Sequence, residues 1–367
     1  MTPPAYPAAR AAAARVHPHY AHQSQPDVET PDVKTIEAII DVAFWTSLRR
    51  EEIYTPRVSL AFVPPPGAGP SVVFERPVPL ASQPLTRLGP AVERPGIHLC
   101  VWRQDGTGDL LVWGATRNLP RLCFVLEVLA PGLLVIKRSR GDDSGKYVNV
   151  AVLQGDEIKI IDPQAATAPD SPDLLASLFA SANTVNVAIE LAVSMREHGR
   201  GGALLVVPEA SQTWRESILQ PVAYAVSPAF SGLRDLMKED PAEKTHRRWQ
   251  EALRRAVDGI AGLTAVDGAT IVDERYDLLA FGAKIIRRAG CHQVGEVVLT
   301  EPIEGAVSQV AEPGQLGGTR HLSAAQFAHD QHDAIALVAS QDGRFTVFGW
   351  SNAEQRVSAH RIEALLL

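Results

Sequence analysis

The chain has 367 residues, which is long enough for two domains that each have their own hydrophobic core. Hydrophobic residues make up 46% and charged residues 21%, as in ordinary globular proteins, and no run approaches the ~18 apolar residues of a membrane span. The net charge of −7 argues against a nucleic-acid partner, and three widely separated cysteines argue against a zinc cluster or a disulfide framework. We therefore expect a cytoplasmic protein without a membrane or nucleic-acid partner.

The first residues of the chain are rich in alanine, proline and histidine. Such a composition buries too little apolar surface to offset the entropy lost on ordering, so we predict a disordered tail over residues 1–30. Three histidines of this tail, His17, His19 and His22, are spaced closely enough to suggest a metal site. Because no folded scaffold is expected there, a solvated tail is the preferred interpretation.

Residues 31–163 have the pattern of a helix followed by short strands. Apolar residues recur on one helical face between Thr35 and Arg50. Strands are predicted at residues 58–63, 98–103 and 110–112, and glycine-containing turns at residues 104–108, 130–132 and 154–156 join antiparallel neighbours. This pattern predicts an α+β domain with an antiparallel sheet, and it contains no catalytic constellation.

A proline-rich segment follows. Residues 162–172 contain three prolines, so we place a linker at residues 164–174 and a second domain at residues 175–367. In this domain Asn186 to Glu197 is typical of an amphipathic helix, and residues 202–209 and 334–340 are typical of buried strands. The alternation of helices and buried strands predicts an α/β fold.

The tripeptide Asp267-Gly268-Ala269 is the first chemically informative motif of the second domain. Its carboxylate is a suitable ligand for a hard cation such as Mg²⁺ or Mn²⁺, and the glycine allows a ligand to approach the backbone closely. In isolation such a tripeptide is usually only a turn between strands.

The second motif is Gly317-Gly318-Thr319-Arg320-His321. It offers backbone N–H groups, a hydroxyl and two side-chain donors, which together can hold phosphate oxygens. Taken alone it also fits a solvated turn. The order of the two motifs and the sequence around them favour a functional interpretation.

Together the motifs resemble the active-site signature of diadenylate cyclases. The helix before Gly199 and the strand Gly202-Ala203-Leu204-Leu205 are similar to the opening helix and GALI-type strand of that family. Residues 332–343 stand where the family has a TDA segment, a strand and a VSEETG run. The resemblance covers about residues 175–355 and implies a mixed sheet flanked by helices.

The resemblance also implies roles for single residues. Asp267 would bind the metal or polarise the attacking hydroxyl, with Arg320 and His321 as the other catalytic groups. Trp214, in a segment similar to the family's aromatic-x-E-T, would stack on adenine, although packing in the core is an equal alternative. The other nucleotide-binding positions would be Gly268, Ala269, Gly317, Gly318, Thr319 and Ser340.

Two positions depart from the family pattern. Leu322 stands where the R-H-R motif has its second arginine, and Gln341 follows Ser340 where the family has glutamate. The first change removes a guanidinium that could pair with phosphate. These departures leave three alternatives: a cyclase making cyclic di-AMP, a related cyclase with another dinucleotide product, and a degenerate nucleotide-binding sensor.

The mechanism that the resemblance implies sets the expected partners. Two ATP molecules must face each other, each 3′-hydroxyl aimed at the other's α-phosphorus, and one domain holds one ATP. We therefore expect a head-to-head homodimer or a higher homo-oligomer, with Mg²⁺ or Mn²⁺ as cofactor. The layout of residues 31–163 in front of this domain resembles the arrangement in which a probable sensor domain of the DACNV type precedes a cyclase.

Overall fold

The computed structural model describes residues 5–21, 29–50, 56–65, 71–139, 147–162, 186–209, 211–240 and 242–367. The chain forms two compact units, residues 1–161 and residues 162–367, which we call the first unit and the second unit. The predicted linker at residues 164–174 lies outside the described residues. Among the described residues, no helix is both long enough and apolar enough to cross a bilayer.

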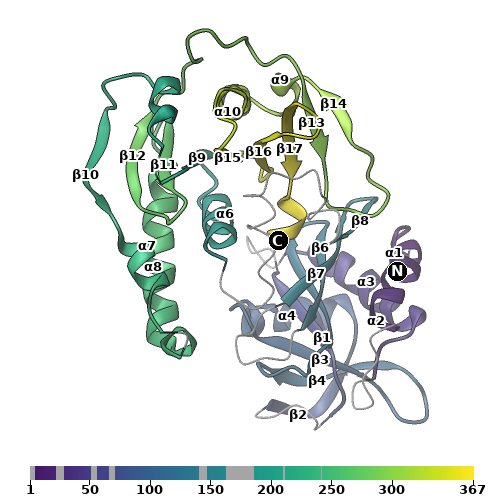
Figure 1. The fold of residues 1–367 in the computed structure, drawn as a ribbon. Coiled ribbons are helices and arrows are strands. Elements are labelled where there is room, and N and C mark those ends of the chain that lie inside the picture. The colour runs from purple at the N-terminus through teal and green to yellow at the C-terminus, as the bar shows by residue number, and fades with distance from the viewer. Residues whose placement is uncertain are drawn as a thin grey trace. The chain divides into compact units, whose positions relative to one another are not determined.

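The first unit contains an eight-stranded sheet with helices packed on it (Figure 1). The strand order is β2-β4-β3-β1-β5-β6-β7-β8. The strands are β1 (Val58–Phe62), β2 (Ser71–Pro79), β3 (His98–Arg103), β4 (Leu110–Thr116), β5 (Phe124–Ala130), β6 (Leu133–Ser139), β7 (Tyr147–Gln154) and β8 (Glu157–Ile160). The predicted strands and hairpins of this unit are confirmed. The sheet is mixed rather than purely antiparallel, because β1 and β3 pair in parallel.

Successive residues along the strands point to opposite faces of the sheet in the first unit. Leu60 and Phe62 face the main core, whereas Ala61 and Val63 belong to a smaller cluster with the buried Cys100. The main core is covered by α1 (Ala9–Val16), α2 (Pro18–Ala21), α3 (Val33–Ser47) and α4 (Ser82–Val92). Helix α3, predicted from the sequence, begins at the cap Asp32, whose carboxylate accepts a hydrogen bond from the backbone N–H of Thr35.

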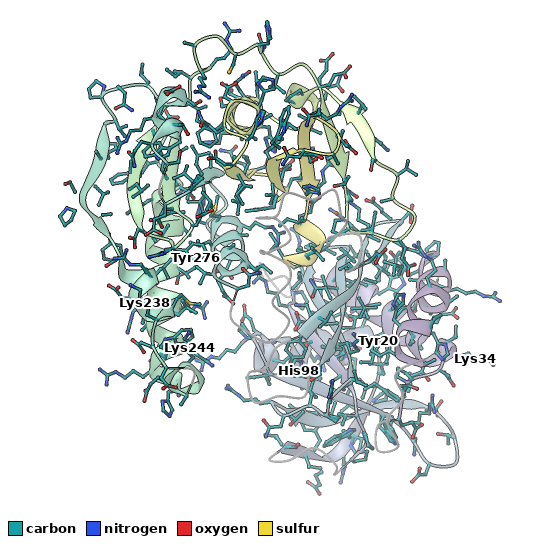
Figure 2. All side chains as sticks on the ribbon, in the orientation of Figure 1. Tyr20, Lys34, His98, Lys238, Lys244 and Tyr276 are labelled. Atoms are coloured by element: carbon teal, nitrogen blue, oxygen red, sulfur yellow. The ribbon has the colours of Figure 1, made fainter. Side chains whose placement is uncertain are left out.

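The prediction of a disordered tail is wrong for residues 5–21. Helix α1 buries alanines at helical spacing against α3, and Tyr20 of α2 is only 1% exposed. The Tyr20 hydroxyl, labelled in Figure 2, donates to the Lys137 carbonyl at 2.8 Å. The ring of Tyr6 stacks on Phe44 with centroids 3.8 Å apart. Alanines fit closely packed helices, so an alanine-rich segment can join a core without large side chains. Of the three closely spaced histidines, His22 lies outside the described residues.

The second unit contains a nine-stranded mixed sheet, as the predicted fold class requires (Figure 1). Its order is β10-β12-β11-β9-β15-β16-β17-β13-β14. The strands are β9 (Gly202–Val207), β10 (Tyr224–Phe230), β11 (Ala269–Asp273), β12 (Leu278–Ala283), β13 (Val297–Thr300), β14 (Gln309–Ala311), β15 (Ile335–Ala339), β16 (Phe345–Ser351) and β17 (Arg356–Arg361). Two pairs are parallel, β9 with β11 and β13 with β17.

Both faces of this sheet are covered, which explains why β9 is apolar throughout. Leu204 and Val206 face one core, and Ala203, Leu205 and Val207 face the other. The first core is closed by α6 (Val187–Glu197), α7 (Gly232–Met237) and α8 (Arg247–Leu263), and the second by the short helices η2 (Thr213–Ser217) and α9 (Pro313–Leu316) and by α10 (Thr319–Asp330). The remaining short helices are η3 (Glu243–Thr245) and η4 (Glu363–Leu365).

Candidate functional site

Three alanines on neighbouring strands form the floor of a pocket in the second unit. Ala269 of β11 pairs with Ala203 of β9 on one side and with Ala283 of β12 on the other. Because methyl groups are small, this row leaves room above the sheet. The resulting pocket of about 170 Å³ is lined by Ala203, Asp267, Gly268, Ala269, Ala283, Lys284, Ile285, Thr319, Arg320 and Ser323. Residues of both sequence motifs therefore line one pocket.

Gly268 is required by the close approach of β12. Its φ is +116°, and a Cβ at this position would lie 2.5 Å from the carbonyl carbon of Gly282. Only glycine fits this backbone conformation and this gap. The close approach brings Lys284, which directly follows β12, to Asp267, with Nζ and Oδ2 2.5 Å apart. The role predicted for Gly268, approach by a ligand, is therefore accompanied by a structural one.

Asp267 is an exposed carboxylate with a cationic neighbour. Its side chain is 87% exposed. The hydrogen bond and charge of Lys284 lower the pKa of Asp267, with a smaller contribution from Arg320. The group is therefore ionised at neutral pH. Sequence reasoning missed Lys284, and its available signal was a lysine immediately after an apolar strand and two residues after Gly282.

The second motif forms the N-terminus of α10. Gly318 is the N-cap residue, no side chain caps the helix there, and Thr319 and Arg320 are its first residues. The first N–H groups of a helix lack intrahelical acceptors, so this end of α10 favours an anion. Thr319 and Arg320 line the pocket, as the sequence predicted for phosphate-binding groups.

His321 points away from the pocket lining and into the core. It is 2% exposed, and its ring packs edge-on against Phe348 with centroids 6.0 Å apart. A Cβ at Gly317 would lie 2.3 Å from its Nδ1, so Gly317 makes room for the imidazole. Burial lowers the pKa of His321, and Nε2 has no hydrogen-bond partner among the described residues. A direct triphosphate contact by His321 would need a different side-chain position.

Trp214 and Ser340 are also absent from the lining of this pocket. Trp214 is 2% exposed within the core, and the Arg215 guanidinium lies 4.5 Å from its ring centroid. The packing alternative therefore describes Trp214 here, because a buried indole offers no free face to a base. Ser340 lies in the turn between β15 and β16, where its N–H donates to the Arg344 carbonyl at 2.9 Å.

A second pocket adjoins the first. It measures about 400 Å³ and is lined by Ile285, Ile286, Arg287, Gln293, Leu322, Ser323 and Gln326. The two pockets share Ile285 and Ser323. Leu322 replaces the second arginine of the R-H-R pattern. It therefore adds apolar surface next to the candidate phosphate-binding residues. Of these two pockets, the second has a volume typical of small-molecule sites, and the first is smaller.

The residues at Asp267 fit a metal ion held jointly with a ligand rather than a complete protein cage. Among the described residues, no group of three or more histidine, cysteine, aspartate or glutamate side chains could hold a metal. Mg²⁺ commonly uses one or two carboxylates together with water and substrate phosphates. The ionised, exposed Asp267 beside a phosphate-type site suits that arrangement, with Lys284 as a competing cation.

Comparison with protein families bears on the first unit. Residues 25–117 match the family model described as probable sensor domain DACNV. No curated protein matches the chain. The match covers less than half of the chain and ends within the first unit. The N-terminal part of the protein is thus similar to a sensor domain, as its layout indicated.

Proposed function

We propose that the second unit is a nucleotide cyclase that condenses two ATP molecules into cyclic di-AMP and releases pyrophosphate. The observation that carries the proposal is the meeting of Asp267-Gly268-Ala269 with Thr319-Arg320 in one pocket. A carboxylate, two cationic side chains and a helix N-terminus at one site suit phosphoryl transfer, which depends mainly on positioning and charge stabilisation. The sensor-type match of residues 25–117 supports the same proposal, since the DACNV name is associated with diadenylate cyclases.

The residues of the chain have distinct roles in this proposal. The N-terminus of α10, Thr319 and Arg320 hold the triphosphate, and Lys284 neutralises further negative charge. Asp267 accepts a hydrogen bond from the 3′-hydroxyl and orients it for attack. Its low pKa keeps it an acceptor at neutral pH. A Mg²⁺ or Mn²⁺ ion bound at Asp267 would supply charge neutralisation at the reacting phosphate.

The reaction needs two copies of this site. In each half, a 3′-oxygen forms a bond to the opposing α-phosphorus, the bond to the leaving pyrophosphate breaks, and the hydroxyl proton passes to solvent. Since one pocket presents one set of phosphate-binding groups, the two ATP molecules must be held by two protomers face to face. The partner required for catalysis is therefore a second copy of this chain.

Leu322 and Gln341, which depart from the family pattern, support two other candidate functions. Leu322 gives the adjoining pocket an apolar wall where the family pattern would provide a cation. A weaker hold on phosphate suits either a cyclase with another dinucleotide product or a nucleotide-binding sensor without turnover. Both candidates use the same pocket. The second cyclase differs from the first candidate in its product, and the sensor differs in forming no product.

Product identification separates these candidates. Purified full-length protein is incubated with Mn²⁺ and ATP, GTP or both, and products are identified by mass spectrometry. Cyclic di-AMP from ATP alone supports the first candidate, and a mixed or guanine product supports the second. Nucleotide binding by calorimetry without any product would leave only the sensor.

Concentration dependence tests the requirement for two protomers. We expect specific activity to rise with protein concentration until the catalytic dimer saturates, because an interface that forms largely through bound ligand is weak without it. Sedimentation on the same samples reports the oligomeric state. Constant specific activity at concentrations where only monomers are present would contradict the face-to-face mechanism.

A further inference from the structure

The loop between α6 and β9 lies against the guanidinium of Arg320. Gly201 in this loop has φ +70°, and a Cβ built on it would lie 3.2 Å from the carbonyl oxygen of Ala339 and 3.3 Å from Nη1 of Arg320. The same Cβ would be 3.5 Å from Cγ of Gln341. The space between the guanidinium and Gly201 is therefore narrow, and a side chain at position 201 would fill it.

Neighbouring contacts fix this loop in place. The side chain of Gln341 donates through Nε2 to the Arg200 carbonyl at 3.4 Å. Nε2 of His198 lies 3.2 Å from Oγ1 of Thr264, which follows α8. A Cβ at Gly202 would lie 2.5 Å from the same Oγ1. The loop is thus packed between the end of α8 and the turn that joins β15 to β16.

Helix α6 holds the other side of that turn. Arg196 donates through Nε to the Gly343 carbonyl at 2.9 Å and through Nη1 to the Leu366 carbonyl at 3.0 Å. Helix α6, the loop and the turn are therefore joined by direct contacts, and the loop passes close to Arg320. Among the described residues, Arg320 has no carboxylate within ion-pair distance, so the space available to its guanidinium takes a larger share in orienting it.

We propose that Gly201 is a positioning residue: because it has no side chain, the loop leaves the space in which the Arg320 guanidinium lies at the pocket. The inference rests on the proposed phosphate-binding role of Arg320.

A matched pair of glycine substitutions tests the contact. Gly199 in the same loop has φ +64°, but a Cβ there would meet nothing within 4 Å. Gly199→Ala and Gly201→Ala thus impose a similar backbone strain, and only Gly201→Ala presses on Arg320. With inorganic tripolyphosphate as the probe in calorimetry, we expect Gly201→Ala to weaken binding about 10-fold, since a charge-assisted contact is displaced. Gly199→Ala should change affinity less than about 2-fold.

A double-mutant cycle separates positioning from a general structural effect. In an Arg320→Ala background, Gly201→Ala should cause no further loss of tripolyphosphate affinity, because its effect passes through the missing guanidinium. A further loss in that background would overturn the proposal, as would equal losses for Gly199→Ala and Gly201→Ala. Thermal unfolding of each variant shows whether it is folded.

Gln341→Ala is the alternative variant for this experiment if the Gly201→Ala protein does not fold. It removes the hydrogen bond to the Arg200 carbonyl, which holds the loop next to Arg320, without imposing backbone strain. We expect an affinity loss of about 3-fold that disappears with Arg320→Ala. No change with Gln341→Ala would overturn the proposal. Wild-type protein that fails to bind tripolyphosphate would overturn it as well, together with the phosphate site.

Product formation on the same samples keeps the two proposals apart. Losses of tripolyphosphate affinity that depend on Arg320, in a protein that forms no cyclic dinucleotide, would support the positioning role of Gly201 and contradict the proposed cyclase activity. Cyclic dinucleotide formation that is insensitive to Gly201→Ala and Gln341→Ala would retain the cyclase and overturn the positioning role.

Discussion

The polar groups around His98 in the first unit and those at the pocket of the second unit differ in how far the fold itself satisfies their hydrogen bonds. In the first unit, the buried His98 has both ring nitrogens engaged, by the Ser59 hydroxyl at 2.7 Å and by the Tyr147 hydroxyl at 2.5 Å. In the second unit, Asp267 is exposed and Arg320 lines an open pocket. Polar groups that the fold already satisfies contribute to stability, whereas those left facing a pocket are available to a ligand. The comparison assigns structural chemistry to the first group and binding chemistry to the second.

The sharpest test of the comparison is Asp267→Asn. We expect product formation to fall by at least about 100-fold while the fold is retained, because the change removes a charge from an exposed turn and leaves its shape intact. Product is measured by mass spectrometry and folding by thermal unfolding.

Asp105→Asn is the matched control for that change. Asp105 is also an exposed aspartate before a positive-φ glycine, in a turn of the first unit. It should leave product formation unchanged. Wild-type rates in Asp267→Asn would contradict both the catalytic and the metal-binding assignments.

Removal of residues 2–21 should destabilise the first unit strongly. This segment buries Tyr6, Ala8, Ala9, Ala12, Ala13, Val16 and Tyr20 in the main core. The expected loss in free energy of unfolding is on the order of 5 kcal/mol or more, which is comparable with the whole stability of a typical domain. Hydrogen exchange of the first unit measures it in the full-length chain.

A conservative substitution calibrates that truncation. Tyr20→Phe removes only the hydroxyl that bonds to Lys137, and we expect a loss of about 1 kcal/mol. Unchanged exchange in the truncated protein would show that the segment packs on the core without stabilising it.

The tail shows where sequence reasoning fails for the fold. Strands and hairpins of the first unit were predictable because alternating apolar residues and glycine turns are local signals, as at β5 and β6. Helices α1 and α2 were not, because alanine-rich sequence is stabilised here by two tyrosines whose partners lie far along the chain, such as Phe44 and Lys137. Strand β2 and helix α4 also went unpredicted. The formation of these four elements depends on nonlocal packing, which local sequence patterns do not show.

The site divides in the same way. The sequence predicted Asp267, Gly268, Ala269, Thr319 and Arg320, and the structure brings these five to one pocket. Its motifs could not show that His321 turns into the core, because that orientation depends on Phe348 and on the space at Gly317. Lys284 was missed because its approach to Asp267 results from the close packing of Gly268, just before β11, against Gly282 of the neighbouring strand β12, a tertiary feature without a motif.

Acid should destabilise the first unit through His98. Burial lowers the pKa of His98 to about 4, below its ordinary value of 6.5. The unfolded chain therefore takes up the proton first, so the stabilisation is present above pH 6.5 and is lost as the pH falls toward 4. The full effect is about 3 kcal/mol.

Hydrogen exchange of β1 and β3 amides across this pH range measures the effect. His98→Gln, which keeps a donor and an acceptor but does not titrate, should remove this part of the pH dependence even if it lowers stability overall. A His98 resonance that titrates near its ordinary pKa in the folded protein would contradict the assignment.

The smallest effect on stability, and a specific one on activity, is expected for Lys284→Met. Lys284 and Asp267 are both more than half exposed, so their ion pair contributes little to folding in water. Lys284 is nevertheless the main cause of the lowered pKa of Asp267, and without it that pKa rises toward its ordinary value. Because the carboxylate is the active form, the acidic limb of the pH–rate profile should move to higher pH. Arg287→Met removes a positive charge from the adjoining pocket and should leave that limb in place. If the limb does not move in Lys284→Met, the group that titrates there is not Asp267, and its proposed role in orienting the 3′-hydroxyl fails.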